Sequence, residues 1–163
     1  MKKLATAAFA ATLLLPAQTR AADYSLLLMG PSYHTLRADN QGRIYNNSNE
    51  GLGVRVRLRQ KNYLSLGAYR NSYSHPSVFA EYDFMPVSFG KFQAGLGVGI
   101  VTGYQRYLAG GAITPLAGVV ASYAFSPNSM LLVRAIPLFN GRTWGGSAKH
   151  GVVFNFALSV KLE

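Results

Sequence analysis

Short runs in which apolar and polar residues alternate follow one another from residue 24 to the end of the chain, with turn-forming residues between them. Alternation with a period of two puts one kind of residue on each face of a β-strand, whereas a helix requires an apolar stripe with a period near 3.6 residues. No segment after residue 22 keeps such a helical stripe for long. The sequence therefore predicts an all-β chain. The eight expected strands are Tyr24–His34, Gly51–Arg59, Tyr63–Tyr73, Ser77–Phe84, Phe92–Tyr104, Ala112–Phe125, Met130–Ile136 and Gly151–Leu162.

The direction in which the apolar faces point decides between a water-soluble protein and a membrane protein. In Gly51–Arg59, leucine and valine alternate with glycine and arginine, so that one face is apolar and the other cationic. A soluble sandwich turns its apolar face inward. Strands of about ten residues, however, match a tilted membrane crossing, and short and long connections alternate here as they do in outer-membrane barrels. Because lipid cannot satisfy an open sheet edge, we predict an eight-stranded antiparallel transmembrane outer-membrane β-barrel; a periplasmic β-sandwich or lipocalin-like barrel is the alternative.

The N-terminal segment has a different composition. It begins with Lys2 and Lys3, continues through the apolar stretch Leu4–Pro16 and ends in small residues before Asp23. A basic start, an apolar centre and a small-residue exit are typical of a secretory signal, and a buried N-terminal helix is the alternative. We therefore expect residues 1–22 to be a signal peptide and residues 23–163 to form a β-barrel domain in the cell outer membrane.

Composition excludes several kinds of chemistry. The chain has no cysteine, which rules out disulfides and thiolate catalysis. Its 16 lysines and arginines against 6 acidic residues make it basic. An exported basic protein is expected to meet anionic lipid or lipopolysaccharide phosphate, and no nucleic acid. His75 and His150 have no partners at metal-ligand spacing, so we expect no metal and no cofactor.

A ladder of three arginines, Arg55, Arg57 and Arg59, follows the cationic face of one expected strand. Such a ladder can anchor a phosphate or carboxylate headgroup. It can also belong to a polar barrel interior in which acidic residues such as Glu81 and Asp83 balance the charge. We favour the second explanation.

Two prolines, Pro115 and Pro137, fall in neighbouring expected strands. Proline lacks a backbone N–H and removes a hydrogen bond from a strand ladder, so it belongs at an edge, a bulge or a strand end. Either the two residues leave a gap between their strands, or each marks the end of its strand.

One group of polar residues is expected at a single rim. The ends of the first and third strands lie on the same side of an up-and-down barrel, which brings His34 near Asn71 and Ser72. A histidine that removes the hydroxyl proton makes a serine nucleophilic. Asn71 can hold the histidine tautomer or polarise an oxyanion, but an amide cannot stabilise an imidazolium by charge. We therefore take His34, Ser72 and Asn71 as candidate catalytic residues, with an ordinary polar turn as the alternative.

Several short motifs occur in order along the chain. They are Ser32-Tyr33-His34, Tyr45-Asn46-Asn47, Gly51-Leu52-Gly53, Tyr69-Arg70-Asn71-Ser72-Tyr73, Gly95-Leu96-Gly97, Val101-Thr102, Pro115-Leu116-Ala117 and Ile136-Pro137. In this order and spacing, the motifs resemble the outer-membrane lipid A palmitoyltransferase family. The resemblance implies a barrel with a buried acyl-chain pocket that opens sideways where prolines interrupt strand pairing. It also implies transfer of a fatty acyl chain from a phospholipid to lipid A.

The resemblance assigns roles to individual residues. His34 and Ser72 match the family's catalytic histidine and serine, whereas Asn71 stands where the family has aspartate. Asp83 falls near the implied floor of the acyl pocket, where a small residue would suit a long chain. The expected partners are a phospholipid and lipid A (lipopolysaccharide) in the outer membrane, and the expected barrel is a monomer. The competing functions are a non-enzymatic small barrel for adhesion or envelope integrity, and a deacylase or phospholipase at the same rim.

Overall fold

The computed structural model of the chain describes residues 23–39, 41–104, 112–139 and 150–162. The expected signal peptide at residues 1–22 lies outside these residues. In the described ranges no helix is long and apolar enough to cross a membrane. The same ranges form eight strands, which confirms the predicted number and order. They are β1 (Asp23–His34), β2 (Ser48–Arg59), β3 (Asn62–Arg70), β4 (Pro76–Phe89), β5 (Phe92–Thr102), β6 (Ile113–Ala124), β7 (Ser129–Phe139) and β8 (His150–Lys161).

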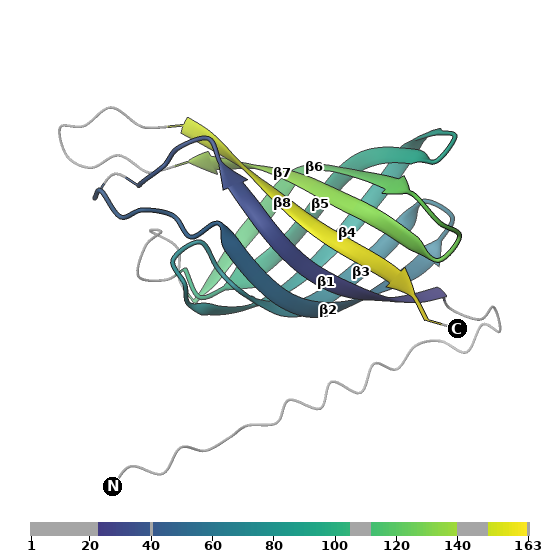
Figure 1. Cartoon of the computed structure of the whole chain (residues 1–163), viewed down its shortest axis with the longest axis horizontal. Coiled ribbons are helices and arrows are strands. Elements are labelled where there is room, and N and C mark those ends of the chain that lie inside the picture. The colour runs from purple at the N-terminus through teal and green to yellow at the C-terminus, as the bar shows by residue number, and fades with distance from the viewer. Residues whose placement is uncertain (1–22, 40, 105–111, 140–149, 163) are drawn as a thin grey trace, which may run out of the picture.

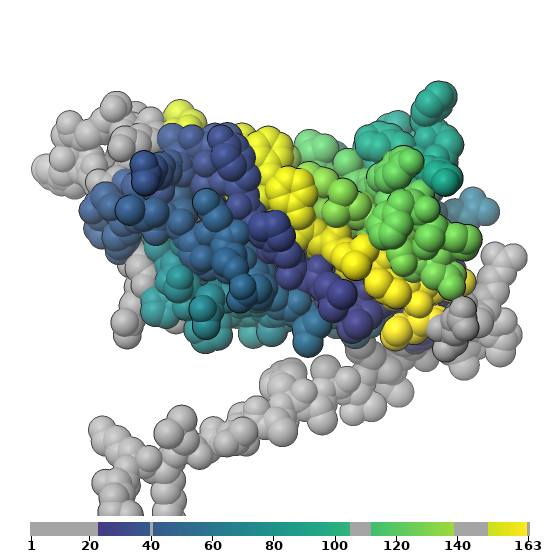
Figure 2. Space-filling view, in the orientation of Figure 1, coloured from purple at the N-terminus to yellow at the C-terminus, as the bar shows by residue number. Residues whose placement is uncertain are grey.

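The strands close into a barrel in which each one pairs antiparallel with its neighbours in sequence, and β8 pairs back onto β1 (Figure 1). The side chains of β1 and β8 lie next to each other on the face shown in Figure 2. β1 begins and β8 ends at one end of the barrel, which we call the terminal end (Figure 1). The opposite end, the loop end, carries the β1–β2 connection and the turn between β3 and β4.

The outer surface of the barrel is apolar, and its interior holds most of the buried polar side chains beside a small apolar cluster that includes Leu27, Val101 and Leu132. Leu52, Val78 and Leu96 are between 58% and 62% exposed, whereas Ser65 and Asp83 are completely buried. A water-soluble sheet would show the reverse distribution. An apolar outer surface on a closed antiparallel sheet is the arrangement that a lipid bilayer requires. The predicted eight-stranded transmembrane barrel is therefore confirmed.

Charged side chains fill the middle of the barrel interior. The Nη1 atom of Arg55 donates to the Oδ2 atom of Asp83 at 2.6 Å, and the Nε atom of Arg134 lies 2.5 Å from the Oε2 atom of Glu81. A Cβ atom at Gly97 would lie 2.8 Å from carboxylate oxygens of both acids, so glycine leaves the space that the network occupies. Of the three arginines in the ladder, Arg55 therefore balances acidic charge inside the lumen, as we favoured.

β4 is longer than its alternation pattern predicts. It continues to Phe89, whereas the prediction ended it at Phe84. Its register with β5 shifts between Phe84 and Val87, on either side of Pro86. A bulge of this kind accommodates a residue without a backbone N–H and interrupts the period of two. The strand therefore continues past the point where its sequence pattern breaks.

The seam between β6 and β7 is incomplete at the loop end. Within the described residues these strands pair only between Val119–Ala124 and Met130–Ala135. Towards the loop end, β6 remains paired with β5 as far as Ile113, and β7 remains paired with β8 as far as Phe139. Pro115 and Pro137 lie inside the two strands, in the parts that are not paired across the seam. Of the two alternatives, the prolines therefore do not mark strand ends, and the structure shows a gap in the ladder between their strands.

Candidate active site

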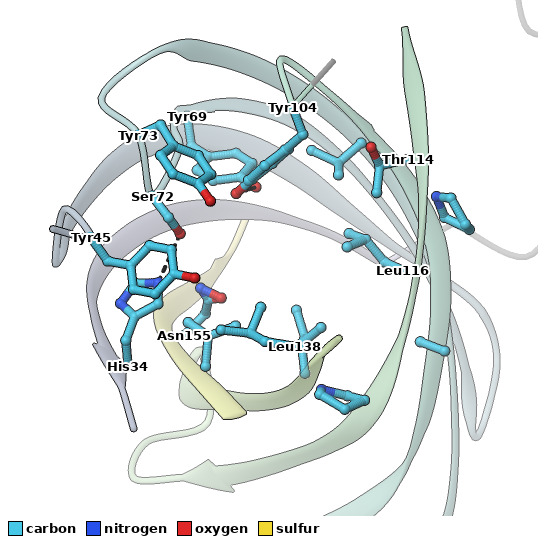
Figure 3. A pocket seen from close by; sticks show the side chains of 16 residues that line it. His34, Tyr45, Tyr69, Ser72, Tyr73, Tyr104, Thr114, Leu116, Leu138 and Asn155 are labelled. Carbon is cyan, nitrogen blue, oxygen red and sulfur yellow. Dashed lines mark hydrogen bonds between the residues drawn. The ribbon is translucent and has the colours of Figure 1, made fainter. Parts of the chain in front are cut away.

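His34 and Ser72 meet at the loop end. His34 is the last residue of β1, Ser72 lies in the turn after β3, and both side chains are buried. The Nε2 atom of His34 lies 2.8 Å from the Oγ atom of Ser72, as the dashed line in Figure 3 shows. This distance suits transfer of the hydroxyl proton to the imidazole, the step that makes a serine nucleophilic. The predicted proximity is confirmed, and the catalytic roles stay a prediction.

The other side of the imidazole is held by the β1–β2 connection. The Nδ1 atom of His34 lies 2.8 Å from the Oδ1 atom of Asn47. An amide oxygen can only accept, so Nδ1 carries the proton and Nε2 is left to accept from Ser72. The ring of Tyr45 stacks on the imidazole, with the ring centroids 4.6 Å apart. The imidazole is therefore fixed in both orientation and tautomer.

Asn71 does not hold the imidazole. Both ring nitrogens of His34 bond to other residues, and the side chain of the completely buried Asn71 makes four hydrogen bonds elsewhere. Its Nδ2 atom donates to Ser77 and to the Gly103 carbonyl, and its Oδ1 atom accepts from the backbone N–H groups of Tyr73 and His75. These bonds close the turn and end β3 at Arg70 instead of Tyr73. The residue that holds the imidazole is therefore Asn47 and not Asn71, and the other expected role of Asn71, polarising an oxyanion, stays a prediction.

Two members of the site, Tyr45 and Asn47, were missed as site residues. They lie in an irregular connection, where no periodicity tells which side chains turn inward. Two signals pointed to them: the Tyr45-Asn46-Asn47 motif within the family resemblance, and their place in a connection that starts at the same rim as His34.

An apolar pocket of about 350 Å³ opens beside the Ser72–His34 pair. Small-molecule sites typically enclose ~300–1,000 Å³. Figure 3 shows the pair and the tyrosines on one side of the pocket and Leu116 and Leu138 on the other. Leu116 and Leu138 belong to the parts of β6 and β7 that flank the gap. The pocket therefore reaches from the serine hydroxyl to the lipid-facing seam.

The charged network is connected to the lining of this pocket through one strand pair. Asn155, which lines the pocket, is the strand partner of Arg134. Arg134 in turn contacts Glu81 and Asp83. Asp83 does not line the pocket itself but pairs with Arg134 behind Asn155, and its expected place near the floor of an acyl pocket stays a prediction.

Tyr73 connects the site to the loop above it. Its ring packs edge-on against Tyr45 and Tyr104, and its hydroxyl donates to Asp39 at 3.3 Å. Burial, together with the neighbouring Tyr45 phenol and Asp39 carboxylate, raises the pKa of Tyr73 well above its usual range. The phenol therefore remains neutral and keeps its proton as a hydrogen-bond donor.

Comparisons with known proteins concern the fold alone. No family model and no curated protein matches this chain. A solved structure from the de novo design of transmembrane β-barrels is similar with a TM-score of 0.55, at 16% identity, over 89% of this chain and 98% of that chain. Neisserial surface protein A (NspA) is similar with a TM-score of 0.49, at 14% identity, over 88% of this chain and 100% of that chain.

The closed sheet and its apolar exterior define a small transmembrane β-barrel of the outer-membrane type. The similarity to a designed transmembrane barrel agrees with this class. The resemblance to the lipid A palmitoyltransferase family stays a prediction from the sequence.

Proposed function

We propose that this protein is an outer-membrane enzyme that uses Ser72 and His34 to move a fatty acyl chain from a phospholipid to lipid A. The observation that carries the proposal is the 2.8 Å contact between His34 Nε2 and Ser72 Oγ at the wall of an apolar pocket. An apolar pocket beside a serine–histidine pair suits an ester whose acyl chain must be kept from water.

The reaction follows from the two side chains. Ser72 gives its proton to His34 as its Oγ atom attacks the ester carbonyl of the phospholipid. The imidazolium then protonates the departing lysophospholipid oxygen, which leaves the acyl group on Ser72. A lipid A hydroxyl next transfers its proton to His34 and attacks the acyl-serine. The imidazolium returns that proton to Ser72 and completes the cycle.

Two further features support a lipid substrate. The gap between β6 and β7 offers an acyl chain a path from the hydrocarbon layer, because the pocket is lined by Pro115 and Pro137 on either side of this gap. Arg37 and Arg70 are exposed at the loop end, where cationic side chains favour the phosphates of lipopolysaccharide. Both features suit the outer leaflet of an outer membrane.

Mass spectrometry of lipid A from cells with and without the protein tests the proposal. The wild-type protein should add the mass of one acyl chain, and His34→Ala and Ser72→Ala should each reduce the acylated fraction at least about a hundredfold, the usual scale of general-base loss. Ser74→Ala and His75→Ala are matched controls, since both residues are exposed in the same turn. Heat-dependent gel mobility establishes that each barrel is folded. Full acylation in both site variants would reject the enzyme.

A non-enzymatic barrel for adhesion or envelope integrity is the second candidate. It is favoured by the hydrogen bonds of the imidazole, whose partners are an amide and a hydroxyl and not a carboxylate. In that case lipid A keeps its mass, and the Ser72→Ala barrel restores detergent resistance to a deletion strain as well as the wild type does. Release of free fatty acid without acylated lipid A would instead indicate a deacylase or phospholipase.

A further inference from the structure

The segment from Tyr45 to Asn47, which holds the imidazole of His34, is itself fixed to the backbone beside Ser72 and to β1. The backbone N–H of Asn46 donates to the carbonyl oxygen of Ser72 at 2.7 Å, and the N–H of Ser32 donates to the carbonyl oxygen of Asn47 at 2.8 Å. Tyr45, just before them, stacks on His34. The side chain of Asn47 is thus attached to a backbone that cannot move independently of the nucleophile or of β1.

The surroundings of Asn47 would accept a carboxylate in place of the amide, whereas those of Asn71 would not. Asn47 is exposed, so a charge at this position keeps most of its solvation. Asn71 is completely buried, and its Nδ2 atom donates to Ser77 Oγ and to the Gly103 carbonyl oxygen at 3.1 Å. A carboxylate at position 71 would place an acceptor against that carbonyl without a donor, which is costly in a buried site.

We infer that Asn47 is the positioning residue of the imidazole, and that the carboxylate of a Ser–His–Asp arrangement belongs at position 47 of this chain and not at position 71. The inference rests on the proposed function, because it concerns how His34 supports Ser72. It follows that Asn47→Asp adds the charge that stabilises the imidazolium, whereas Asn71→Asp disrupts the turn that carries Ser72.

Kinetics of the purified, detergent-solubilised barrel test this inference. The substrate is a short-chain p-nitrophenyl ester, and labelling of Ser72 by a fluorophosphonate serves as a second measure of its nucleophilicity. Loss of the triad carboxylate costs serine proteases about 10⁴-fold in kcat. We expect Asn47→Asp to raise kcat at least about tenfold with little change in KM, and Asn47→Ala to lower kcat at least about tenfold. The acid limb of the rate–pH profile should move to higher pH in Asn47→Asp, because a carboxylate favours the protonated imidazole.

Asn71→Asp is the matched control, since it introduces the same charge in the same rim. It should lower the rate or the yield of folded barrel. Two results would overturn the inference and leave the proposed function standing, provided that Ser72 of the wild type reacts. One is an Asn71→Asp enzyme that is faster than the wild type. The other is an Asn47→Asp enzyme that is no faster than the wild type. Failure of Ser72 to react in the wild type and in Asn47→Asp rejects both.

A spectroscopic measurement keeps the inference testable if Asn47→Asp does not fold. Nitrogen-15 chemical shifts of the three histidines distinguish the two neutral tautomers, and the His34 signal is assigned by its absence in His34→Ala. We expect the Nδ1–H tautomer in the wild type and a mixture of tautomers in Asn47→Ala, with the signals of His75 and His150 unchanged. A wild-type Nε2–H tautomer, or an unaffected His34 signal in Asn47→Ala, contradicts the assigned role.

Discussion

At the scale of single residues, Asp39 organises the first part of the loop above the pocket. Its Oδ1 atom accepts the N–H groups of Gln41 and Arg43 at 2.8 and 3.0 Å, and its Oδ2 atom accepts the Nε–H of Arg43 at 2.6 Å. The Arg43 guanidinium in turn lies 5.3 Å from the centre of the Tyr73 ring. One carboxylate therefore connects the β1–β2 connection to the turn that carries Ser72.

Asp39 should keep this loop ordered at moderately acidic pH. Burial raises the pKa of Asp39, but hydrogen bonds from Arg43 and Gln41 outweigh it and hold the pKa below its usual value. Because the pKa is lower in the folded loop than in the unfolded chain, the carboxylate stabilises the loop fully at any pH above the ordinary carboxyl pKa of about 3.9. This stabilisation is lost only when the pH falls through the lower pKa of the folded state. Hydrogen exchange should therefore show slow amides at Gln41 and Arg43 down to about pH 4, and fast ones in Asp39→Ala, which removes the oxygen that accepts both N–H groups. Strand amides serve as the control. Equal protection in both proteins would contradict this role.

At the scale of elements, the incomplete seam between β6 and β7 gives a prediction about substrate access. Ala117 and Pro137 are both exposed residues that line the pocket on opposite sides of the gap. Since the chain has no cysteine, Ala117→Cys with Pro137→Cys introduces two unique thiols that a short bifunctional thiol reagent can join. The joined barrel should lose acyl transfer to lipid A at least tenfold, because the path from the bilayer is closed. Each single-cysteine variant, treated with the same reagent, should remain active.

Labelling of Ser72 by a water-soluble fluorophosphonate separates a closed gap from a damaged site. The labelling rate should not change when the thiols are joined, because this reagent reaches Ser72 from the loop end. Undiminished lipid A acylation in the joined barrel would show that the acyl chain takes another path.

The strands were predictable because their signal is local and repeated. Alternation in β2 or β5 depends only on which face each residue occupies, whereas the extension of β4 to Phe89 depends on a bulge at Pro86 that interrupts the period. The site was predictable in part for the same reason. His34 and Ser72 follow strands whose ends share a rim, but the choice between Asn47 and Asn71 depends on loop hydrogen bonds that no periodic pattern encodes. Sequence adjacency to Ser72 favoured Asn71, and tertiary structure selected Asn47.

At the scale of the whole molecule, the barrel encloses ion pairs whose side chains are almost completely buried. Asp83 is completely buried between Arg55 and Arg134, so Asp83→Asn leaves two buried guanidinium groups to share the carboxylate of Glu81. Removing one partner of a buried pair costs about 3–5 kcal/mol, whereas replacing both with apolar residues is often neutral. Urea unfolding in lipid vesicles should show a loss of that size for Asp83→Asn and a smaller loss for Arg55→Met combined with Asp83→Leu.

Asp23→Asn is the control for this comparison, because Asp23 pairs with Arg57 and Lys161 at the terminal end and its side chain is 32% exposed. Exposed pairs contribute about 0–1 kcal/mol, so the variant should unfold close to the wild type. Equal losses for Asp23→Asn and Asp83→Asn would mean that water screens the lumen as it screens the rim. In that event the charged network could not act as the floor of the acyl pocket, since a hydrated lumen would admit solvent to the pocket from below.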